Sequence, residues 1–345
     1  MTTVDVTVMG AGVFGLSVAY ACAKRGASVQ VIDPGGVASG ASGGIVGALA
    51  PHVPENWNAK KQFQFESLIA SEGFWTEVEN RSGLPTGYIR SGRLQPLADD
   101  KAVELARERE KTAQELWRGK ARWEVVSAQG TAWEPPTATG LFVHDTLSAH
   151  IHPRQAVTAL AEALAGIGCQ VYAEGAPEGK VVWATGWRGL VEMSAKAPRQ
   201  VGNGVKGQAA LLRHDASGAP QLFADTLHII PHLDGTVAVG STSEREFDDP
   251  TKTDQALEDV VARAKAAMPV LKNAPVLQRW AGVRPRGRSR APMLGMHPHR
   301  SGEFVANGGF KIGFGMAPKV GEVMADLVLD GSVTYPDDFD VSQNL

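Results

Sequence analysis

The chain of 345 residues has little cysteine, no long apolar run and no excess of basic charge. Its two cysteines, Cys22 and Cys169, are too few for a cysteine-based metal site, and we expect buried thiols rather than a disulfide. A net charge of −3 argues against nucleic acid as the main partner, because binding along a phosphate backbone needs a basic surface. No apolar stretch reaches the roughly 18 residues of a membrane span, and no charged segment precedes an apolar one at the N-terminus. These absences predict a cytoplasmic protein without a membrane span.

Glycine is abundant instead, and its most informative positions lie near the N-terminus. Residues 4–33, VDVTVMGAGVFGLSVAYACAKRGASVQVID, predict a strand, a glycine turn, a helix and a second strand. Gly10 permits the tight turn, Gly12 lets the backbone approach a pyrophosphate, and Gly15 lets the helix pack on the strand. Asp33, at the end of the second strand, can accept ribose hydroxyls. The pattern predicts a dinucleotide-binding unit with the phosphates at the positive helix end.

The segment that follows is rich in glycine, serine and alanine. Residues 34–52, PGGVASGASGGIVGALAPH, allow backbone amides to approach a bulky group, so we expect a second cofactor-contacting segment. A flexible surface loop is the alternative. Such a loop has fewer apolar residues than Ile45, Val46, Ala48 and Leu49 provide here.

Apolar periodicity predicts the elements in the middle of the chain. Helices are expected over 62–82, 99–118, 153–166 and 254–268. Residues 205–241 alternate as β structure, with Asp234 and Gly235 in the turn of a hairpin. His150 and His152 form a pair, but no third ligand has suitable spacing and a proline explains the helix start that follows, so no metal site is expected.

The C-terminal part predicts a strand followed by a helix that faces the cofactor. Residues 304–315, FVANGGFKIGFG, look strand-like and run into APKVGEVMADLVLDG, where Pro318 suits the first helical turn and Gly331 the C-terminal cap. The positive N-terminus of this helix points back at the glycine-rich loop. It favours a cofactor edge that becomes negative on reduction, as in a flavin.

Several separate segments together resemble one family. They are ASGASGG with GALAPH (38–52), VVWATGWRG (181–189), VKGQ (205–208), HIIPHLDGTVAVGSTSE (228–244), WAGVRPR (280–286) and GGFKIGFGMAPKVGEVMADL (308–327). In order and spacing they resemble the flavin-dependent amino-acid oxidase superfamily, which includes D-amino-acid oxidase, glycine oxidase and monomeric sarcosine oxidase. The resemblance covers nearly the whole chain.

This resemblance implies an α/β fold in which a Rossmann-like FAD-binding domain is interleaved with an antiparallel-sheet α+β substrate domain. The FAD-binding domain is expected to comprise residues 1–85, 140–200 and 280–345. The substrate domain is expected to comprise residues 86–139 and 201–279. Neither cysteine matches the covalent flavin attachment of sarcosine oxidase, so the resemblance implies FAD held without a covalent bond.

The resemblance also assigns residues to the cofactor. The first two segments contribute Gly10, Gly12, Val13, Phe14, Gly15, Asp33, Pro34, Ser39, Gly40, Ala41, Ser42, Gly43 and Gly44. Later segments contribute Ala176, Ala184, Thr185, Gly186, Trp187, Arg284, Gly308, Gly309, Phe310, Lys311 and Ile312. The loop 308–312 is expected to line the flavin pyrimidine, with Lys311 balancing its developing charge.

Three residues are implied in catalysis: Arg284, His228 and Lys311. Arg284 matches the arginine that pairs with a substrate carboxylate in the family, and a guanidinium fork fits a carboxylate bidentately. The alternative is a surface arginine in the basic segment PRGRSRAP, which is either solvated or receives an extra acidic group. His228 stands where relatives often have tyrosine; it is expected either to meet a carboxylate while titrating near neutrality, or to be a half-buried strand residue. No general base is nominated.

The implied reaction is oxidation of the C–N bond of a small amino acid or N-methyl amino acid by hydride transfer, giving an imine that hydrolyses. Oxygen, a quinone or an electron-transfer partner is the expected acceptor, and an oligomer is possible. Two alternatives remain: an FAD-dependent dehydrogenase of a hydroxy acid or polyol with a quinone acceptor, and a non-catalytic flavin-binding module. An NAD enzyme is disfavoured, because 43–51 and 308–312 fit flavin-facing segments better.

Overall fold

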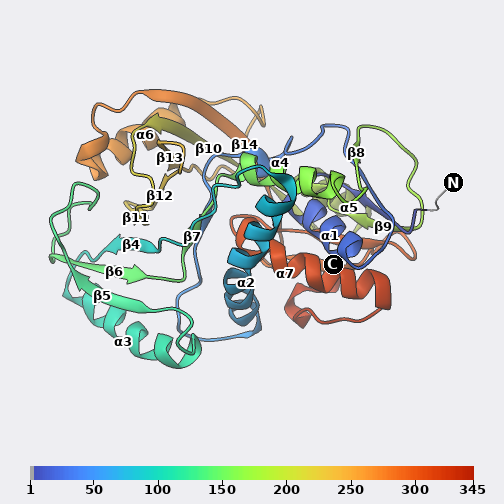
Figure 1. Ribbon diagram of the computed structural model, residues 1–345, viewed down its shortest axis with the longest axis horizontal. Helices are drawn as coiled ribbons and strands as arrows, with labels where there is room; N and C mark the ends of the chain where they lie inside the picture. Colours follow the sequence, from blue (N-terminus) through green and yellow to red (C-terminus); the bar gives the residue numbers. More distant parts are fainter. Residues whose placement is uncertain (1–3) are drawn as a thin grey trace.

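The computed structural model describes residues 4–345, which form two halves side by side (Figure 1). One half is built on a six-stranded sheet in the order β15-β16-β9-β1-β2-β8. Its strands are β1 (Val6–Met9), β2 (Val29–Ile32), β8 (Val171–Tyr172), β9 (Lys180–Trp183), β15 (Met293–Met296) and β16 (Phe304–Asn307). All neighbours pair in parallel except β15, which joins the edge antiparallel.

The central strand of this sheet is buried on both faces, since Thr7 points to the opposite face from its two valine neighbours and is also fully buried. Val6 and Val8 of β1 are fully buried, and α1 (Val13–Lys24) crosses from β1 to β2. Around α1 pack α2 (Ala59–Ser82), α4 (Pro153–Ala165) and α7 (Gly313–Ala325). Helix α5 (Gly186–Lys196) follows β9 directly. A short two-stranded sheet joins β3 (Ala48–Leu49) to β7 (Ala149–His150).

The other half is an eight-stranded sheet in the order β14-β10-β13-β12-β11-β4-β6-β5. Its strands are β4 (Arg93–Pro96), β5 (Trp123–Ser127), β6 (Leu141–Asp145), β10 (Gly202–Arg213), β11 (Gln221–Ala224), β12 (Leu227–Pro231), β13 (Thr236–Gly240) and β14 (Val276–Gly287). The pairing is antiparallel except between β4 and β11. Helix α6 (Gln255–Ala267) covers β10, β12 and β13, and α3 (Asp100–Leu116) covers β5.

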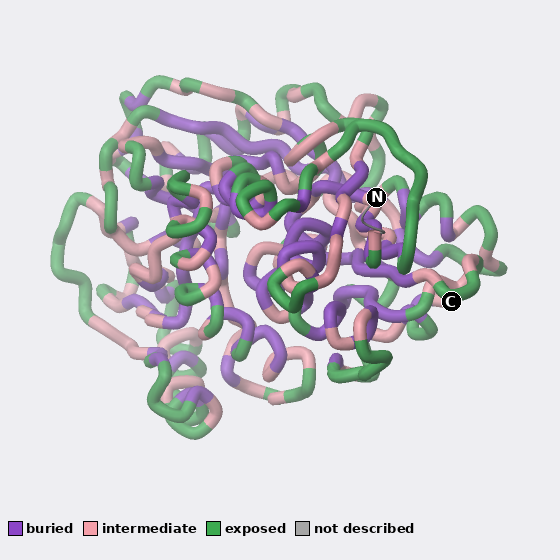
Figure 2. The backbone as a smooth tube through the Cα atoms, turned by 45° about the vertical axis from the view of Figure 1, so that its right-hand side comes forward, coloured by how far each residue is buried: buried purple, intermediate pink, exposed green. Residues whose placement is uncertain are grey.

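The remaining elements are short. Single 3₁₀ turns occur at Ala41–Gly43, Pro269–Leu271, Asp337–Phe339 and Val341–Asn344, and a π turn at Asp326–Asp330 extends α7. Figure 2 shows the buried backbone concentrated in the interior of both halves, with exposed segments on the outer helices and loops. None of the helices formed by residues 4–345 combines the length and apolar character that a membrane crossing needs.

The predicted α/β architecture is confirmed, and so are the four helices in the middle of the chain, which correspond to α2, α3, α4 and α6. Asp234 and Gly235 lie in the predicted turn between β12 and β13, and Gly235 has a φ of 78°. Cys22 and Cys169 are free and buried, as expected. Burial raises their pKa to about 12 and about 11, so both thiols stay protonated at neutral pH.

The C-terminal elements differ from the prediction. The strand expected over 304–315 ends at Asn307, because Gly308 and Phe310 have φ values of 75° and 41° and leave the extended conformation. Helix α7 already begins at Gly313, so Pro318 lies inside the helix rather than in its first turn. Gly331 forms the predicted left-handed cap, with its amide donating to the carbonyl of Leu327 at 3.0 Å.

The two sheets also intersect the expected domain boundaries. Strand β6 and residues 280–287 of β14 both belong to the eight-stranded sheet, in which β6 pairs with β5 and β14 pairs with β10. The expected boundaries instead assign 140–200 and 280–345 to the FAD-binding domain. Both strands lead from one sheet towards the other, so the chain passes between the halves within continuous segments. The exact division into domains stays a prediction.

Candidate active site

A cavity of about 1220 Å³ is lined by residues from both halves of the molecule. On one side stand the carboxyl ends of β1 and β2 and the glycine-rich segment after β2. On the other stand β12, β14 and the loop after β13. Ligands of parallel α/β sheets bind outside the carboxyl ends of the strands, which is the position of this cavity.

The glycines of the first motif shape the cavity for steric reasons. Gly10 has a φ of 116°, and a Cβ there would collide with the carbonyl oxygen of Ala184 at the end of β9. A Cβ at Gly15 would collide with the carbonyl oxygen of Gly10, so Gly15 lets α1 pack directly on the turn. Gly12 has an extended backbone, and its Cβ position meets only the hydroxyl of Ser42 at 3.2 Å. The turn therefore brings bare backbone to the cavity at the start of α1.

Asp33 directly follows β2 and lies beside this glycine turn. Its carboxylate accepts hydrogen bonds from the amides of Ala11 and Gly35, each at 2.8 Å. These bonds fix the carboxylate at the end of β2, and both Asp33 and Pro34 line the cavity. The remaining acceptor positions on the carboxylate suit ribose hydroxyls, as the sequence suggests.

The segment from Ser39 to Gly44 lines the cavity along its whole length. Its Ser42 hydroxyl accepts a hydrogen bond from the amide of Val13 at 3.0 Å, which ties this segment to the start of α1. The guanidinium of Arg154 donates to the carbonyl of Gly43 at 3.1 Å. Arg154 also lines the cavity and was not predicted, because α4 reaches this segment only through tertiary packing.

Most of the later cofactor residues also reach the cavity. Val13, Phe14, Ala184, Thr185, Gly186, Trp187, Gly309, Phe310 and Lys311 line it. Gly15, Gly308 and Ile312 do not, although Gly15 sits beneath the turn and Ile312 is the N-terminal cap of α7. Trp280 also lines the cavity. It belongs to the WAGVRPR segment (280–286) but is not among the residues that the resemblance assigns to the cofactor.

Ala176 lies away from the cavity. It is exposed in the connection between β8 and β9, where its carbonyl accepts a hydrogen bond from Gln30 at 3.1 Å. The connection turns towards β1, since Thr7 and Glu178 exchange hydrogen bonds. The structure therefore does not bring Ala176 to the place that the resemblance implies.

The first turn of α7 supplies backbone amides to the cavity. Gly313 and Phe314 line it, and Ile312 caps the helix without a side-chain hydrogen bond. The first amides of a helix have no intrahelical partner and carry about half a positive charge together. This turn suits the negative edge of a reduced flavin, as the sequence suggests, although the helix begins earlier than expected.

Arg284 of β14 also lines the cavity. Its side chain lies across Gly207 of β10, where any Cβ would collide with the guanidinium. The guanidinium donates to the carbonyl of Thr242 at 3.2 Å and to the hydroxyl of Ser241. Desolvation lowers the pKa of Arg284 to about 10, partly offset by the carboxylate of Glu244, so it remains charged at neutral pH.

His228 is the half-buried strand residue that the sequence offers as one of two alternatives, and the near-neutral titration expected in the other is wrong. It is partly buried on β12 beside Phe223, with ring centroids 4.9 Å apart. Desolvation, followed by the charges of Arg93, Lys311 and Arg284, lowers its pKa to about 3. The imidazole is therefore neutral at pH 7 instead of titrating near neutrality, and it can meet a carboxylate only as a neutral hydrogen-bonding group.

Lys311 follows the positive-φ residue Phe310 and lines the same cavity. Desolvation and the nearby charge of Arg284 lower the pKa of Lys311. Arg284, His228 and Lys311 all line this cavity, so the structure brings together the three residues that the resemblance implies in catalysis. Two cations in one cavity favour anionic ligands there.

A second group of histidines, His150, His152 and His232, is buried outside the cavity lining. The rings of His152 and His232 are 4.6 Å apart, and Nε2 of His232 donates to the carbonyl of Ile45 at 2.9 Å. Burial lowers the pKa of His150 and of His232 to about 4. Among residues 4–345 no cluster of metal-ligating side chains is found, and His152 instead caps α4.

Acid should destabilise the protein through these histidines. Their folded pKa lies below the usual value, so the unfolded chain binds more protons and stability falls as the pH drops from about 6.5 towards 4. Between pH 7.5 and 5 we expect a loss of about 2 kcal/mol per histidine. His150→Gln should flatten the dependence of the melting temperature on pH. The exposed His299→Gln is the matched control, and equal slopes in both variants would contradict the assignment.

The geometry fits one class of protein. The site combines a glycine turn at a helix N-terminus, a second segment that lines the cavity with backbone, and a pair of cations in the cavity wall. These features are typical of a dinucleotide-dependent oxidoreductase with two interleaved halves. The chain belongs to the FAD dependent oxidoreductase family, whose model matches residues 5–327. FAD is therefore its cofactor, as expected, and the protein is an enzyme rather than a non-catalytic flavin-binding module.

Similar proteins agree over nearly the whole chain. Glycine oxidase from Bacillus licheniformis is 26% identical over 356 residues, which cover 95% of this chain and 94% of the relative. Glycine oxidase from Pseudomonas putida is 28% identical over 362 residues, covering 94% of both chains. The crystal structure of iminodiacetate oxidase from Chelativorans has a TM-score of 0.82 at 21% identity, covering 97% of this chain and 98% of that one.

Proposed function

We propose that the protein oxidises the C–N bond of a small amino acid or N-methyl amino acid, giving an imine that hydrolyses. The guanidinium of Arg284 carries this proposal. It stands in the cavity wall, and among residues 4–345 its hydrogen bonds go only to an uncharged hydroxyl and a carbonyl. Its charge is thus available to a substrate carboxylate. The names of the relatives, oxidases of glycine and iminodiacetate, support a small amino acid.

The side chains around Arg284 mainly orient the substrate. Arg284 binds the carboxylate, and the neutral imidazole of His228, which lines the same cavity, offers a hydrogen bond. When bound, FAD supplies the two-electron acceptor that takes a hydride from the α carbon. Lys311 and the first turn of α7 provide positive charge where negative charge develops. The reaction needs a neutral amine but no protein nucleophile.

An anaerobic reduction screen tests this function. Mixing the purified yellow protein with amino acids and N-methyl amino acids should bleach the flavin, and the imine should appear as its keto acid or aldehyde with ammonia or an amine. Hydroxy acids and polyols serve as the comparison set. If only the hydroxy acids or polyols bleach the flavin, the hydroxy-acid or polyol dehydrogenase replaces the proposed amine oxidation. Adding oxygen or a quinone to the reduced protein and following the return of the yellow colour then identifies the electron acceptor.

We further propose that FAD is bound without a covalent bond and that the protein is cytoplasmic. Cys22 and Cys169 are buried in the core and do not line the described cavity, which supports non-covalent binding. Two free thiols are also typical of a reducing compartment. The electron acceptor, oxygen or a quinone, and an oligomeric state stay predictions from the sequence.

A further inference from the structure

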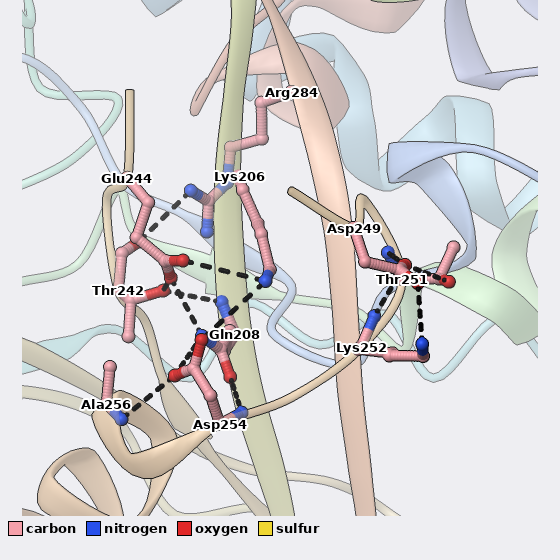
Figure 3. Close-up of polar contacts among 10 residues, drawn as sticks. All are labelled: Lys206, Gln208, Thr242, Glu244, Asp249, Thr251, Lys252, Asp254, Ala256 and Arg284. Atoms are coloured by element: carbon pink, nitrogen blue, oxygen red, sulfur yellow. Dashed lines mark hydrogen bonds and ion pairs between the residues drawn. The ribbon is translucent and has the colours of Figure 1, made fainter. Parts of the chain in front are cut away.

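A polar network lies behind Arg284 and has no role in the chemistry proposed above (Figure 3). At its centre is Lys206 of β10, which is only 4% exposed. Its Nζ lies 3.7 Å from a carboxylate oxygen of Glu244 and 3.8 Å from one of Asp254. These two acidic residues stand at the two ends of the loop that joins β13 to α6. One buried cation therefore holds both ends of this loop.

Gln208, two residues further along β10, completes the network. Its amide nitrogen donates to Glu244 at 3.0 Å and to Asp254 at 2.8 Å, while its amide oxygen accepts from the backbone of Asp254 at 2.9 Å. Backbone hydrogen bonds of 2.9 Å in both directions also join Lys206 to Glu244. The first end of the loop is thus fixed to β10 by main chain and side chains together.

This fixed end of the loop is the part that holds Arg284. The two acceptors of the guanidinium are the Thr242 carbonyl and the Ser241 hydroxyl, two and three residues before Glu244 in the chain. The carboxylate of Glu244 accepts from the Thr242 hydroxyl, and its charge acts on Arg284. Two cations and two carboxylates therefore share the network, and Figure 3 shows the carboxylate of Glu244 beside both the Nζ of Lys206 and the guanidinium of Arg284.

We propose that Lys206 is a positioning residue that holds Glu244 away from Arg284 and so keeps the guanidinium open to a substrate carboxylate. The inference rests on the proposed function, because it assumes that a carboxylate binds at Arg284. Without Lys206, Glu244 loses its ion-pair partner in a partly buried position, and Arg284 is the cation that already feels its charge. An internal carboxylate then competes with the substrate.

Ligand titration of the oxidised holoenzyme tests this role without requiring turnover. Acetate and propionate are added to the wild type, Lys206→Met and Lys206→Met/Glu244→Gln, and binding is followed by the flavin absorbance. We expect the dissociation constant of Lys206→Met to rise about tenfold or more, as for loss of a charge-assisted contact. The double variant should return to within about threefold of the wild type, because the competing carboxylate is gone. Lys206→Arg should retain most of the affinity.

Matched measurements separate positioning from a general structural defect. Lys24→Met removes the surface ion pair with Glu77 and should leave carboxylate binding unchanged. Thermal melting and FAD affinity are recorded for every variant. Damaged folding predicts that the double variant binds as weakly as Lys206→Met, and that result would overturn the inference. If Lys206→Met binds acetate and propionate as tightly as the wild type, the inference is also overturned. If the wild type itself binds neither acid, the proposed carboxylate site at Arg284 is wrong, and the role of Lys206 falls with it.

Discussion

Arg284→Ala is expected to lower kcat/KM for carboxylate-bearing substrates by about 10²- to 10³-fold, while the spectrum of bound FAD stays unchanged. The variant removes two charge-assisted hydrogen bonds to the carboxylate, which together stabilise the complex by about 3–4 kcal/mol. The fold should tolerate it, because among residues 4–345 the guanidinium donates hydrogen bonds only to the Ser241 hydroxyl and the Thr242 carbonyl. Stopped-flow reduction at a series of substrate concentrations measures the effect directly.

Arg284→Lys is the matched control for charge. It keeps the positive charge but loses the planar fork, so its loss should be intermediate between that of the wild type and that of Arg284→Ala. An amine substrate without a carboxylate should reduce the wild type and Arg284→Ala at similar rates. Unchanged saturation by amino acids in Arg284→Ala would remove Arg284 from the substrate site.

The cofactor half of the site could be predicted from the sequence because its determinants are local. The spacing of Gly10, Gly12 and Gly15 fixes a turn whose φ angle and close approaches only glycine satisfies. Asp33 follows at the end of the next strand, and its contact with Ala11 spans 22 residues of the same βαβ unit. Such features depend on main-chain geometry within one βαβ unit, and the residue types and their spacing in that unit are sufficient to predict this geometry.

The substrate half was predicted less completely because its properties arise from distant segments. The low pKa of His228 reflects burial and the charges of Arg93, Lys311 and Arg284, which come from three separate parts of the chain. Sequence pattern cannot supply that sum. The same reason explains why Arg154 was missed. The early start of α7 is different in kind: Gly313 and Gly315 have low intrinsic helix propensity, and packing overrides it.

The variant Gly12→Asp is expected to lose FAD while the protein remains folded. Gly12 precedes α1 with a φ of −83° and a ψ of 175°, which any residue adopts, and aspartate is a favoured residue at a helix N-cap. Gly12→Asp should therefore keep the fold. Its carboxylate, however, stands where the bare backbone faces the cavity and where the pyrophosphate is expected.

We accordingly expect Gly12→Asp to be purified colourless, with affinity for FAD reduced by about a hundredfold or more, since like charges at a shared site repel by a few kcal/mol. Gly12→Asn separates charge from size: it has the same shape and the same capping ability, so it should retain more FAD than Gly12→Asp does. FAD titration by fluorescence quenching, with circular dichroism to verify the fold, gives both numbers. Equal affinities in the two variants would mean that steric exclusion alone operates, and wild-type affinity in both would place the pyrophosphate away from the start of α1.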